Sequence, residues 1–342
     1  MSIANEGLEK FSIQMVPSGR EIRCASDQTV LDAAIRSGMS VPYGCRHGNC
    51  SSCKAKVVDG DYELMNRISE FALMGFERDE GYILMCSTLP CSDLVIEVEE
   101  DEEPGVRLFP VYDFNGQVVS NERVTPDIHI IRIQLSDPVD LHYAAGQYFE
   151  FNVPGLDDTR AYSMANEYTP SGLLEFYVKL IPHGKGSTYL TSLQTGDVVS
   201  GSGPYGRMQL RTLDKDIVFI AGGSGLAPIK ALLESAFAQN FSHQAWLFYG
   251  ARTTKDLFLI EQWRSWKEQY PNFHFVPALS NLEEHEMWDG EEGYIADVVS
   301  RSFESLNNTD VYLCGPPIMI QTTQKSLYKL GVRSSSIYYD EF

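Results

Sequence analysis

The chain has 342 residues, of which 43% are hydrophobic and 22% are charged, and this length and composition predict two or three globular domains. Its formal net charge of -20 argues against nucleic acid and anionic membrane as partners, because both require clustered Lys and Arg. No apolar run reaches the ~18 residues of a transmembrane helix, and the start of the chain lacks the basic and apolar regions of a secretory signal. We therefore expect a soluble, cytoplasmic protein.

The negative charge is concentrated in the first third of the chain. Residues 1–106 contain nine Lys and Arg against nineteen Asp and Glu, a balance of -10 out of the total of -20. One interpretation is that this excess keeps the protein in solution. The other is an acidic docking face that steers association with a basic partner.

The first hundred or so residues predict a small domain that ends in an acidic linker. Residues 11–16 and 20–25 predict two short strands around a Pro-Ser-Gly turn, and residues 29–37 predict a helix. A cysteine-rich loop follows directly, and residues 93–98 predict a closing strand. The acidic segment 99–105, which contains Pro and Gly, predicts the linker.

Four cysteines have the spacing of an iron–sulfur site. Cys45, Cys50 and Cys53 form a C-x4-C-x2-C pattern and Cys86 follows later, which is the plant-type 2Fe-2S arrangement. Structural zinc is an alternative, although it more naturally uses two C-x2-C pairs. Disulfides are a further alternative, disfavoured by the odd number of seven cysteines and the lack of a signal peptide. The pattern predicts an electron carrier.

The rest of the chain changes pattern twice. Short alternating runs with frequent Gly and Pro predict an antiparallel barrel, and they cover residues 128–135, 147–153, 174–180 and 197–200. Apolar runs separated by helical segments then predict an open parallel α/β sheet, and they cover residues 217–221, 245–249, 273–276 and 310–314. We therefore expect three domains, over residues 1–104, 105–212 and 213–342.

A glycine-rich turn follows the first strand of the predicted parallel sheet. The segment Ala221–Pro228 reads Ala-Gly-Gly-Ser-Gly-Leu-Ala-Pro and leads into a predicted helix. Free N–H groups at a helix N-terminus suit a pyrophosphate. The turn does not match the G-x-G-x-x-G dinucleotide fingerprint, and tight packing alone is an equally good explanation of its glycines.

Three motifs together resemble the ferredoxin-NADP reductase superfamily: the glycine turn, Arg160-Ala-Tyr-Ser163 and Cys314-Gly-Pro-Pro317. Their order after a ferredoxin domain is similar to that of reductases of bacterial multicomponent oxygenases, above all the soluble di-iron methane, alkane, alkene and phenol monooxygenases. Further local matches are Glu63, Gly203–Gly206 and Tyr339–Phe342. The resemblance implies a β-grasp 2Fe-2S ferredoxin, an antiparallel β-barrel that binds FAD and an α/β parallel-sheet domain that binds NADH.

The resemblance also implies which residues hold the flavin. Arg160 would offer a charged fork to the flavin diphosphate, Tyr162 would pack on the isoalloxazine and the Ser163 hydroxyl would lie near its N5. Lys179 is a further cofactor-binding candidate. The segment after it resembles one that wraps the flavin phosphates, through Gly184, Gly186, Ser187 and Thr188. A surface ion pair is the alternative role for Arg160.

The nicotinamide dinucleotide is assigned to the other two motifs. The implied contacts are Gly222, Gly223, Ser224, Gly225, Pro228, Cys314, Gly315 and Pro316. Cys314 and Ser163 would hold the nicotinamide C4 near the flavin N5, and Asp340 is the third catalytic candidate. Asp340 and Phe342 belong to an acidic-x-aromatic ending that would approach the flavin's far face. Asp replaces the more usual Glu there, and a frayed terminus is the alternative.

Charge favours NADH over NADPH as the electron donor. A 2'-phosphate requires Arg or Lys near the ribose, whereas residues 280–286 after the third strand are acidic. Arg252 is the one residue in this region that argues the other way.

Two details of the cysteine region depend on the resemblance. Cys91 competes with Cys86 as fourth ligand, but it lies in a Pro-Cys-Ser-Asp turn and the resemblance aligns Cys86. The family usually has Gly or Ala where Ser51 stands, so the Ser51 hydroxyl either donates to sulfur and shifts the potential or points outward. Cys24 is predicted to be a small core residue on a strand.

The implied function is electron transfer from NADH to FAD, then to the 2Fe-2S cluster, and finally to the hydroxylase of a di-iron monooxygenase docked by the acidic ferredoxin domain. A plant-type cluster carries one electron, so the flavin must split the pair that NADH supplies. The alternative is the reductase of a Rieske ring-hydroxylating dioxygenase or of a deoxysugar dehydrase, which share the domain order. A non-enzymatic ferredoxin module would explain only the first domain.

Overall fold

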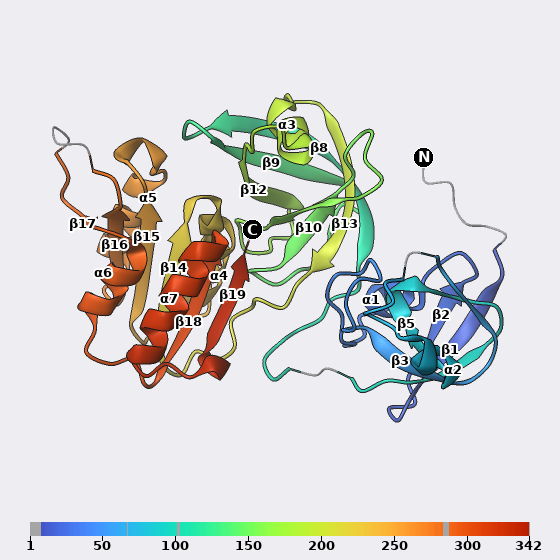
Figure 1. Cartoon of the computed structure of the whole chain (residues 1–342). Coiled ribbons are helices and arrows are strands. Elements are labelled where there is room, and N and C mark those ends of the chain that lie inside the picture. The colour runs from blue at the N-terminus through green and yellow to red at the C-terminus, as the bar shows by residue number, and fades with distance from the viewer. Residues whose placement is uncertain (1–7, 67, 101–102, 283–286, 342) are drawn as a thin grey trace. The chain divides into compact units, whose positions relative to one another are not determined.

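The computed structural model describes residues 8–66, 68–100, 103–282 and 287–341. The chain divides into two compact units, Met1–Tyr112 and Asp113–Phe342, which are described separately (Figure 1). The α-helices are α1 (Val30–Arg36), α2 (Gly75–Asp79), α3 (Lys185–Ser192), α4 (Leu226–Ala238), α5 (Ile260–Gln269), α6 (Ile295–Ser302) and α7 (Pro317–Lys329). None of the helices within these ranges has the length and apolar character needed to cross a membrane.

The first unit is built on a five-stranded sheet of order β2-β1-β7-β3-β5, beside a separate β4–β6 pair. Its strands are β1 (Lys10–Val16), β2 (Glu21–Ala25), β3 (Lys54–Asp59), β4 (Tyr62–Leu64), β5 (Tyr82–Leu84), β6 (Thr88–Pro90) and β7 (Leu94–Glu97). Strands β1 and β7 run parallel and the other pairs antiparallel. Helix α1 starts at its Thr29 cap and buries Leu31 and Ala34, as its sequence predicts. This is the predicted β-grasp arrangement.

The second unit begins with a six-stranded barrel of order β11-β10-β13-β8-β9-β12. Its strands are β8 (Tyr112–Arg123), β9 (Ile128–Asp137), β10 (Tyr148–Phe151), β11 (Arg160–Ser163), β12 (Leu173–Lys179) and β13 (Val198–Tyr205). An antiparallel bridge between Met164 and Phe176 joins the two ends of the sheet. Inside the barrel, Phe151 and Phe176 pack edge to face with ring centroids 5.0 Å apart. The barrel prediction is confirmed.

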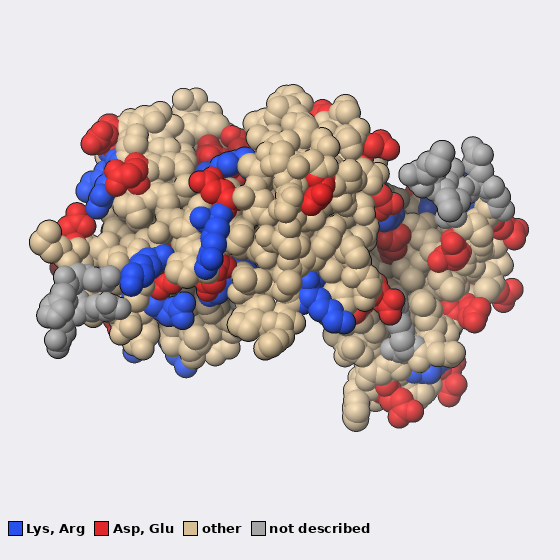
Figure 2. All heavy atoms as spheres, turned by 90° about the horizontal axis from the view of Figure 1, so that it is seen from above, with Lys and Arg blue, Asp and Glu red and all other residues tan. Residues whose placement is uncertain are grey.

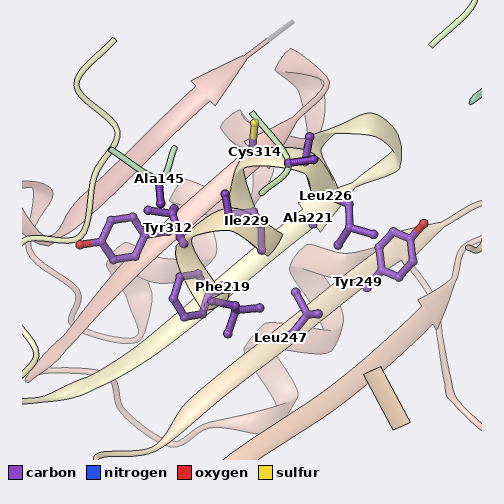
Figure 3. Packing of buried hydrophobic residues seen from close by; sticks show 14 of the residues in the cluster. Ala145, Phe219, Ala221, Leu226, Ile229, Leu247, Tyr249, Tyr312 and Cys314 are labelled. Atoms are coloured by element: carbon purple, nitrogen blue, oxygen red, sulfur yellow. The ribbon is translucent and has the colours of Figure 1, made fainter. Parts of the chain in front are cut away.

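A parallel sheet of order β17-β16-β15-β14-β18-β19 completes the second unit. Its strands are β14 (Asp216–Gly222), β15 (Ala245–Ala251), β16 (Phe273–Leu279), β17 (Glu291–Glu292), β18 (Thr309–Gly315) and β19 (Ile337–Glu341). Phe219 and Leu247 on neighbouring strands pack with Ile229 of α4 in a core that also contains Ala221 and Cys314 (Figure 3). The strand order reverses between β14 and β18, and ligands of open α/β sheets bind at such a switch point.

Candidate functional site

The four predicted cluster ligands form two pairs in the first unit. Cys45 interacts with Cys50, and Cys53 with Cys86. The hydrogen bond with Cys86, together with burial, raises the pKa of Cys53. Burial also raises the pKa of the Cys50 thiol, but hydrogen bonds from Ser52 and Cys45 outweigh it and the pKa falls to about 7.

The pairing suits a cluster of two irons that each take two cysteines. In the part of the chain that the structure describes, no group of three or more His, Cys, Asp and Glu side chains is arranged to hold a metal ion. A two-iron cluster instead spreads four thiolates over two metals. The donor set of this loop therefore fits the 2Fe-2S group that its spacing predicts.

The backbone of the cysteine loop is folded around sulfur. The N–H groups of Cys45 and His47 donate to Cys50 Sγ and Cys45 Sγ, each at 3.4 Å. Arg46 and Gly48 adopt left-handed φ values of 60° and 76°, which let the chain turn tightly. Donors aimed at sulfur stabilise negative charge there and so influence the reduction potential of a bound cluster.

The structure also shows the surroundings of Ser51, Cys91 and Cys24, for which the sequence left alternatives or made a prediction. The Ser51 hydroxyl donates to the Ala72 carbonyl oxygen at 3.1 Å, so in this structure it ties the loop to the next segment instead of contacting sulfur. Cys91 is exposed in the turn after β6, whereas Cys86 is buried. Cys24 is a fully buried core residue of β2, as predicted.

The second unit contains a cavity of about 1310 Å³ at the switch point of its parallel sheet. One wall comes from the barrel, through β11 and the start of α3. The other comes from the turn after β14, the loop after β18 and the end of β19. Motifs that are far apart in the sequence thus face a single cavity, which is large enough for a cofactor and a substrate.

The barrel wall holds the predicted flavin motif. Arg160, Tyr162, Ser163, Gly184, Gly186 and Ser187 all line the cavity. A side chain at Gly186 would approach Arg160 Cγ to 2.6 Å, so glycine is needed where α3 begins against β11. Arg160 donates to the Thr159 carbonyl oxygen at 2.7 Å, and within the described residues it has no carboxylate partner. Arg160 thus lines the cavity without forming an ion pair among the described residues, which fits an anionic ligand better than the surface ion pair.

The glycine turn combines cavity lining with close packing. Gly222, Gly223 and Ser224 line the cavity. A side chain at Gly225 would lie 2.2 Å from the Cys314 carbonyl oxygen, so this glycine is required by the approach of the turn to β18. The two explanations offered by the sequence therefore apply to different glycines of one turn.

Cys314 and Asp340 lie opposite each other on β18 and β19. Asp340 lines the cavity, and its burial raises the pKa of its carboxyl to about 6. Cys314 is fully buried in the core of the parallel sheet (Figure 3), and burial followed by the Asp340 charge raises the pKa of its thiol. Residues Ile337–Glu341 form a paired strand, so the frayed-terminus alternative does not hold for them, while Phe342 lies outside the described residues.

Five of the predicted contacts lie outside the lining of the cavity. They are Thr188, Gly225, Pro228, Cys314 and Gly315, whereas Pro316 and Lys179 do line it. Thr188 is exposed and Pro228 is buried in the first turn of α4. The cofactor contacts, these five and those that line the cavity alike, remain predictions.

Many lining residues are not identified by the sequence motifs as cofactor contacts, among them Asp127, Tyr177 and Arg252. Asp127 Oδ2 forms ion pairs with Lys179 Nζ at 3.5 Å and with Arg252 Nη2 at 3.9 Å. Tyr177 lies two positions before Lys179 on β12 and so shares its face, which is a signal that the sequence does contain. Ser280, the first residue of the acidic segment 280–286, also lines the cavity. Residues 283–286 of that segment lie outside the described residues.

Comparison with known families matches each part of the chain. Residues 13–91 match the 2Fe-2S iron-sulfur cluster binding domain, residues 115–210 the oxidoreductase FAD-binding domain and residues 219–325 the oxidoreductase NAD-binding domain. The matched ranges leave gaps between the domains, so the predicted limits after residues 104 and 212 stay predictions.

Whole-chain relatives are also found. The phenol hydroxylase P5 protein of Acinetobacter pittii is 36% identical over 97% of this chain and 94% of its own length. The propane 2-monooxygenase reductase component of Mycolicibacterium smegmatis is 36% identical over 98% of this chain and 97% of its own. The crystal structure of the reductase GcoB from Amycolatopsis superposes with a TM-score of 0.82 at 29% identity, covering 97% of this chain and 98% of that one. Electron-transfer components of ring-hydroxylating dioxygenases are further relatives.

The fold and the two sites define a flavin- and iron–sulfur-dependent oxidoreductase that takes electrons from NADH. The chain belongs to the ferredoxin-NADP reductase superfamily and, within it, to the reductase components of multicomponent monooxygenases.

Proposed function

We propose that this reductase passes electrons from NADH through FAD and the 2Fe-2S cluster to the hydroxylase of a di-iron monooxygenase, and that its ferredoxin domain docks on that hydroxylase. One observation carries the proposal. The flavin motif lines the same cavity as part of each nicotinamide motif, Gly222–Ser224 of the glycine turn and Pro316 after β18, so a hydride donor and acceptor can meet there. The cytoplasm is the compartment that this role implies.

The cavity residues have distinct roles in this proposal. Arg160 and the N-terminus of α3 hold the flavin diphosphate, while Tyr162 and Ser163 orient the ring. Gly223 and Ser224 present their backbone to the dinucleotide. When bound, FAD supplies the conversion of a two-electron hydride donor into single electrons for the cluster.

Electrons leave through the first unit, whose charge and apolar side chains support docking near the cluster. Phe71, Met74 and Phe76 are 91%, 47% and 59% exposed. Their segment is tied to the cysteine loop by the bond from Ser51 to the Ala72 carbonyl oxygen. Asp and Glu outnumber Lys and Arg on the visible face of this unit (Figure 2). An apolar contact with an acidic surround suits a partner that offers an apolar pocket ringed by basic groups.

The test of partner class uses purified oxygenase components as electron acceptors. NADH-reduced protein is mixed with the hydroxylase of a phenol monooxygenase or with the oxygenase of a Rieske ring-hydroxylating dioxygenase, and reduction is followed anaerobically. We expect the di-iron hydroxylase to be reduced at least about tenfold faster. Faster reduction of the Rieske component would assign the chain to the alternative class. Transfer to neither, with cytochrome c still reduced, would also count against the proposal.

The docking contact is tested with the same hydroxylase. Phe71→Ser is expected to raise the apparent KM for the hydroxylase about tenfold, because exposed aromatic residues often dominate such interfaces. Val58→Ala is the control, since Val58 is 59% exposed but lies near the end of β3 away from Cys53. An unchanged KM for Phe71→Ser, or an equal rise in both variants, would place the docking surface elsewhere.

A further inference from the structure

A buried charged network joins the barrel to the nicotinamide half of the second unit. Lys230 of α4 is only 7% exposed. Its Nζ lies 2.6 Å from Glu234 Oε1, 3.4 Å from Glu175 Oε1 and 2.9 Å from the Ala165 carbonyl oxygen. Arg132 Nε contacts the other oxygen of Glu175 at 2.6 Å. A buried ammonium group is costly unless it is paired and hydrogen-bonded in this way.

The network extends from the barrel side to the helix side through further hydrogen bonds. The Glu167 N–H donates to Glu234 Oε2 at 3.0 Å, which ties the loop after β11 to α4. The Tyr177 hydroxyl donates to Glu175 Oε1 at 3.2 Å. The cations Arg132 and Lys230 therefore meet the carboxylates Glu175 and Glu234 at the junction.

The network lies directly behind the cavity. Glu175, Tyr177 and Lys179 alternate along β12 and so share one face, while Ala227 and Lys230 are three residues apart on one face of α4. Tyr177 of β12 and Ala227 of α4 both line the cavity. The pair one step deeper is Glu175 and Lys230, which bind each other. The ion pair thus joins β12 to α4 beneath these two lining residues.

We propose that the Lys230–Glu175 pair is a clamp that sets the width of the slot between β12 and the glycine turn, where nicotinamide and flavin must meet. Lys230 is in this sense a positioning residue, which acts through Tyr177 and the start of α4. Hydride transfer requires reacting atoms about 3–3.5 Å apart, and a shift of about 1 Å reduces a rate by as much as 10²-fold. The inference rests on the cofactor assignment of this cavity made above.

Lys230→Met tests the clamp, because methionine keeps the apolar length of lysine without its charge. The limiting rate of flavin reduction by NADH and the dissociation constant of NADH are measured by stopped-flow absorbance, per bound FAD. We expect the rate to fall at least about tenfold while the dissociation constant changes less than about twofold. Hydrogen exchange of residues 173–179 in the oxidised protein without NADH is expected to increase, and this readout does not depend on activity.

Two further variants make the test decisive. Glu175→Gln combined with Lys230→Met removes both charges of the Lys230–Glu175 pair, so that Glu175 is not left as a carboxylate without its lysine, while Glu234 loses Lys230 as it does in the single variant. The double variant is expected to behave like the single variant. Lys215→Met is the matched control, because Lys215 pairs with buried Asp310 at 2.8 Å away from the cavity lining. It is expected to keep the wild-type rate.

Several outcomes would overturn the clamp. They are a rate within twofold of wild type in both Lys230 variants, an equal fall in Lys215→Met, or loss of FAD from both variants, which would make the network a flavin-binding element. If the wild-type protein itself did not reduce FAD with NADH, the cofactor assignment would fail instead.

Discussion

The cysteine loop and the dinucleotide cavity show two ways of building a redox site. The loop places three of four cluster ligands within nine consecutive residues, Cys45–Cys53, and its own backbone N–H groups point at sulfur. The cavity gathers segments from Asp127 to Glu341, and its walls meet only after the barrel and the parallel sheet have packed together. A change in the loop should therefore affect one cofactor, whereas a change in the packing of the second unit should affect the meeting of two.

The largest effect is expected from Cys50→Ser, which removes one thiolate of the cluster. Reduction of cytochrome c by NADH should be abolished, because single electrons leave through the cluster. Ferricyanide reduction should persist, because the cavity that holds the flavin is in the other unit. Steady-state assays with both acceptors on one preparation provide the internal control. Normal cytochrome c reduction would show that electrons leave by another route.

Arg160→Ala should affect the other cofactor. Loss of a charge-assisted contact of about 1.5–3 kcal/mol should weaken FAD binding by roughly 10- to 150-fold. The broad absorption of the cluster should remain. Flavin released on denaturation and iron content, measured on the same sample, separate the two cofactors. Lys325→Ala, at an exposed position of α7 outside the cavity lining, is a comparison for general loss of positive charge. Stoichiometric FAD in Arg160→Ala would rule out the diphosphate role.

Gly225→Ala tests whether packing in the second unit controls its cavity. Its added methyl group would lie 2.2 Å from the Cys314 carbonyl oxygen, a clash expected to lower the free energy of unfolding by about 3 kcal/mol. Gly223→Ala is the control, because its methyl group meets only Ile128 Cδ1 at 4.0 Å and its cost is the left-handed backbone, about 1 kcal/mol. Thermal unfolding of both variants measures the difference. Equal losses would mean that the turn can move away from β18.

The smallest effect concerns the pH dependence of stability at Asp340. Burial raises the pKa of this carboxyl to about 6, whereas an unfolded Asp titrates near 3.9. Between these values the folded state binds more protons, so the stability of the wild type falls as pH rises through this window. Asp340→Asn should remove that loss and gain about 1–2 kcal/mol relative to wild type between pH 4 and 7.

Urea unfolding at pH 4.5 and pH 7 measures this effect. Asp157→Asn, in an exposed loop of the same unit, is the control. A constant difference between Asp340→Asn and wild type at the two pH values would contradict the burial of the carboxylate.

The sequence by itself determined the cluster site and the order of the three folds. Cysteine spacing and the Gly-rich turn are local signals, because contiguous residues encode a tight loop and its donors. Strand patterns were clear where apolar residues dominate, as in β14 and β15. They were missed in β8, where the buried face carries Gly116 between Phe114 and Val118 and so lacks a continuous apolar signal, and in β19, which is stabilised by pairing with β18.

Only the tertiary structure decided which distant residues meet. The β18–β19 register places Asp340 opposite Cys314, and closure of the barrel against α4 places Glu175 beside Lys230. Neither contact has a local signature, because each depends on strand order and on packing between segments separated by many residues. A sequence motif can predict that a cofactor binds. The distance between two cofactors is set by how the elements that carry the motifs pack.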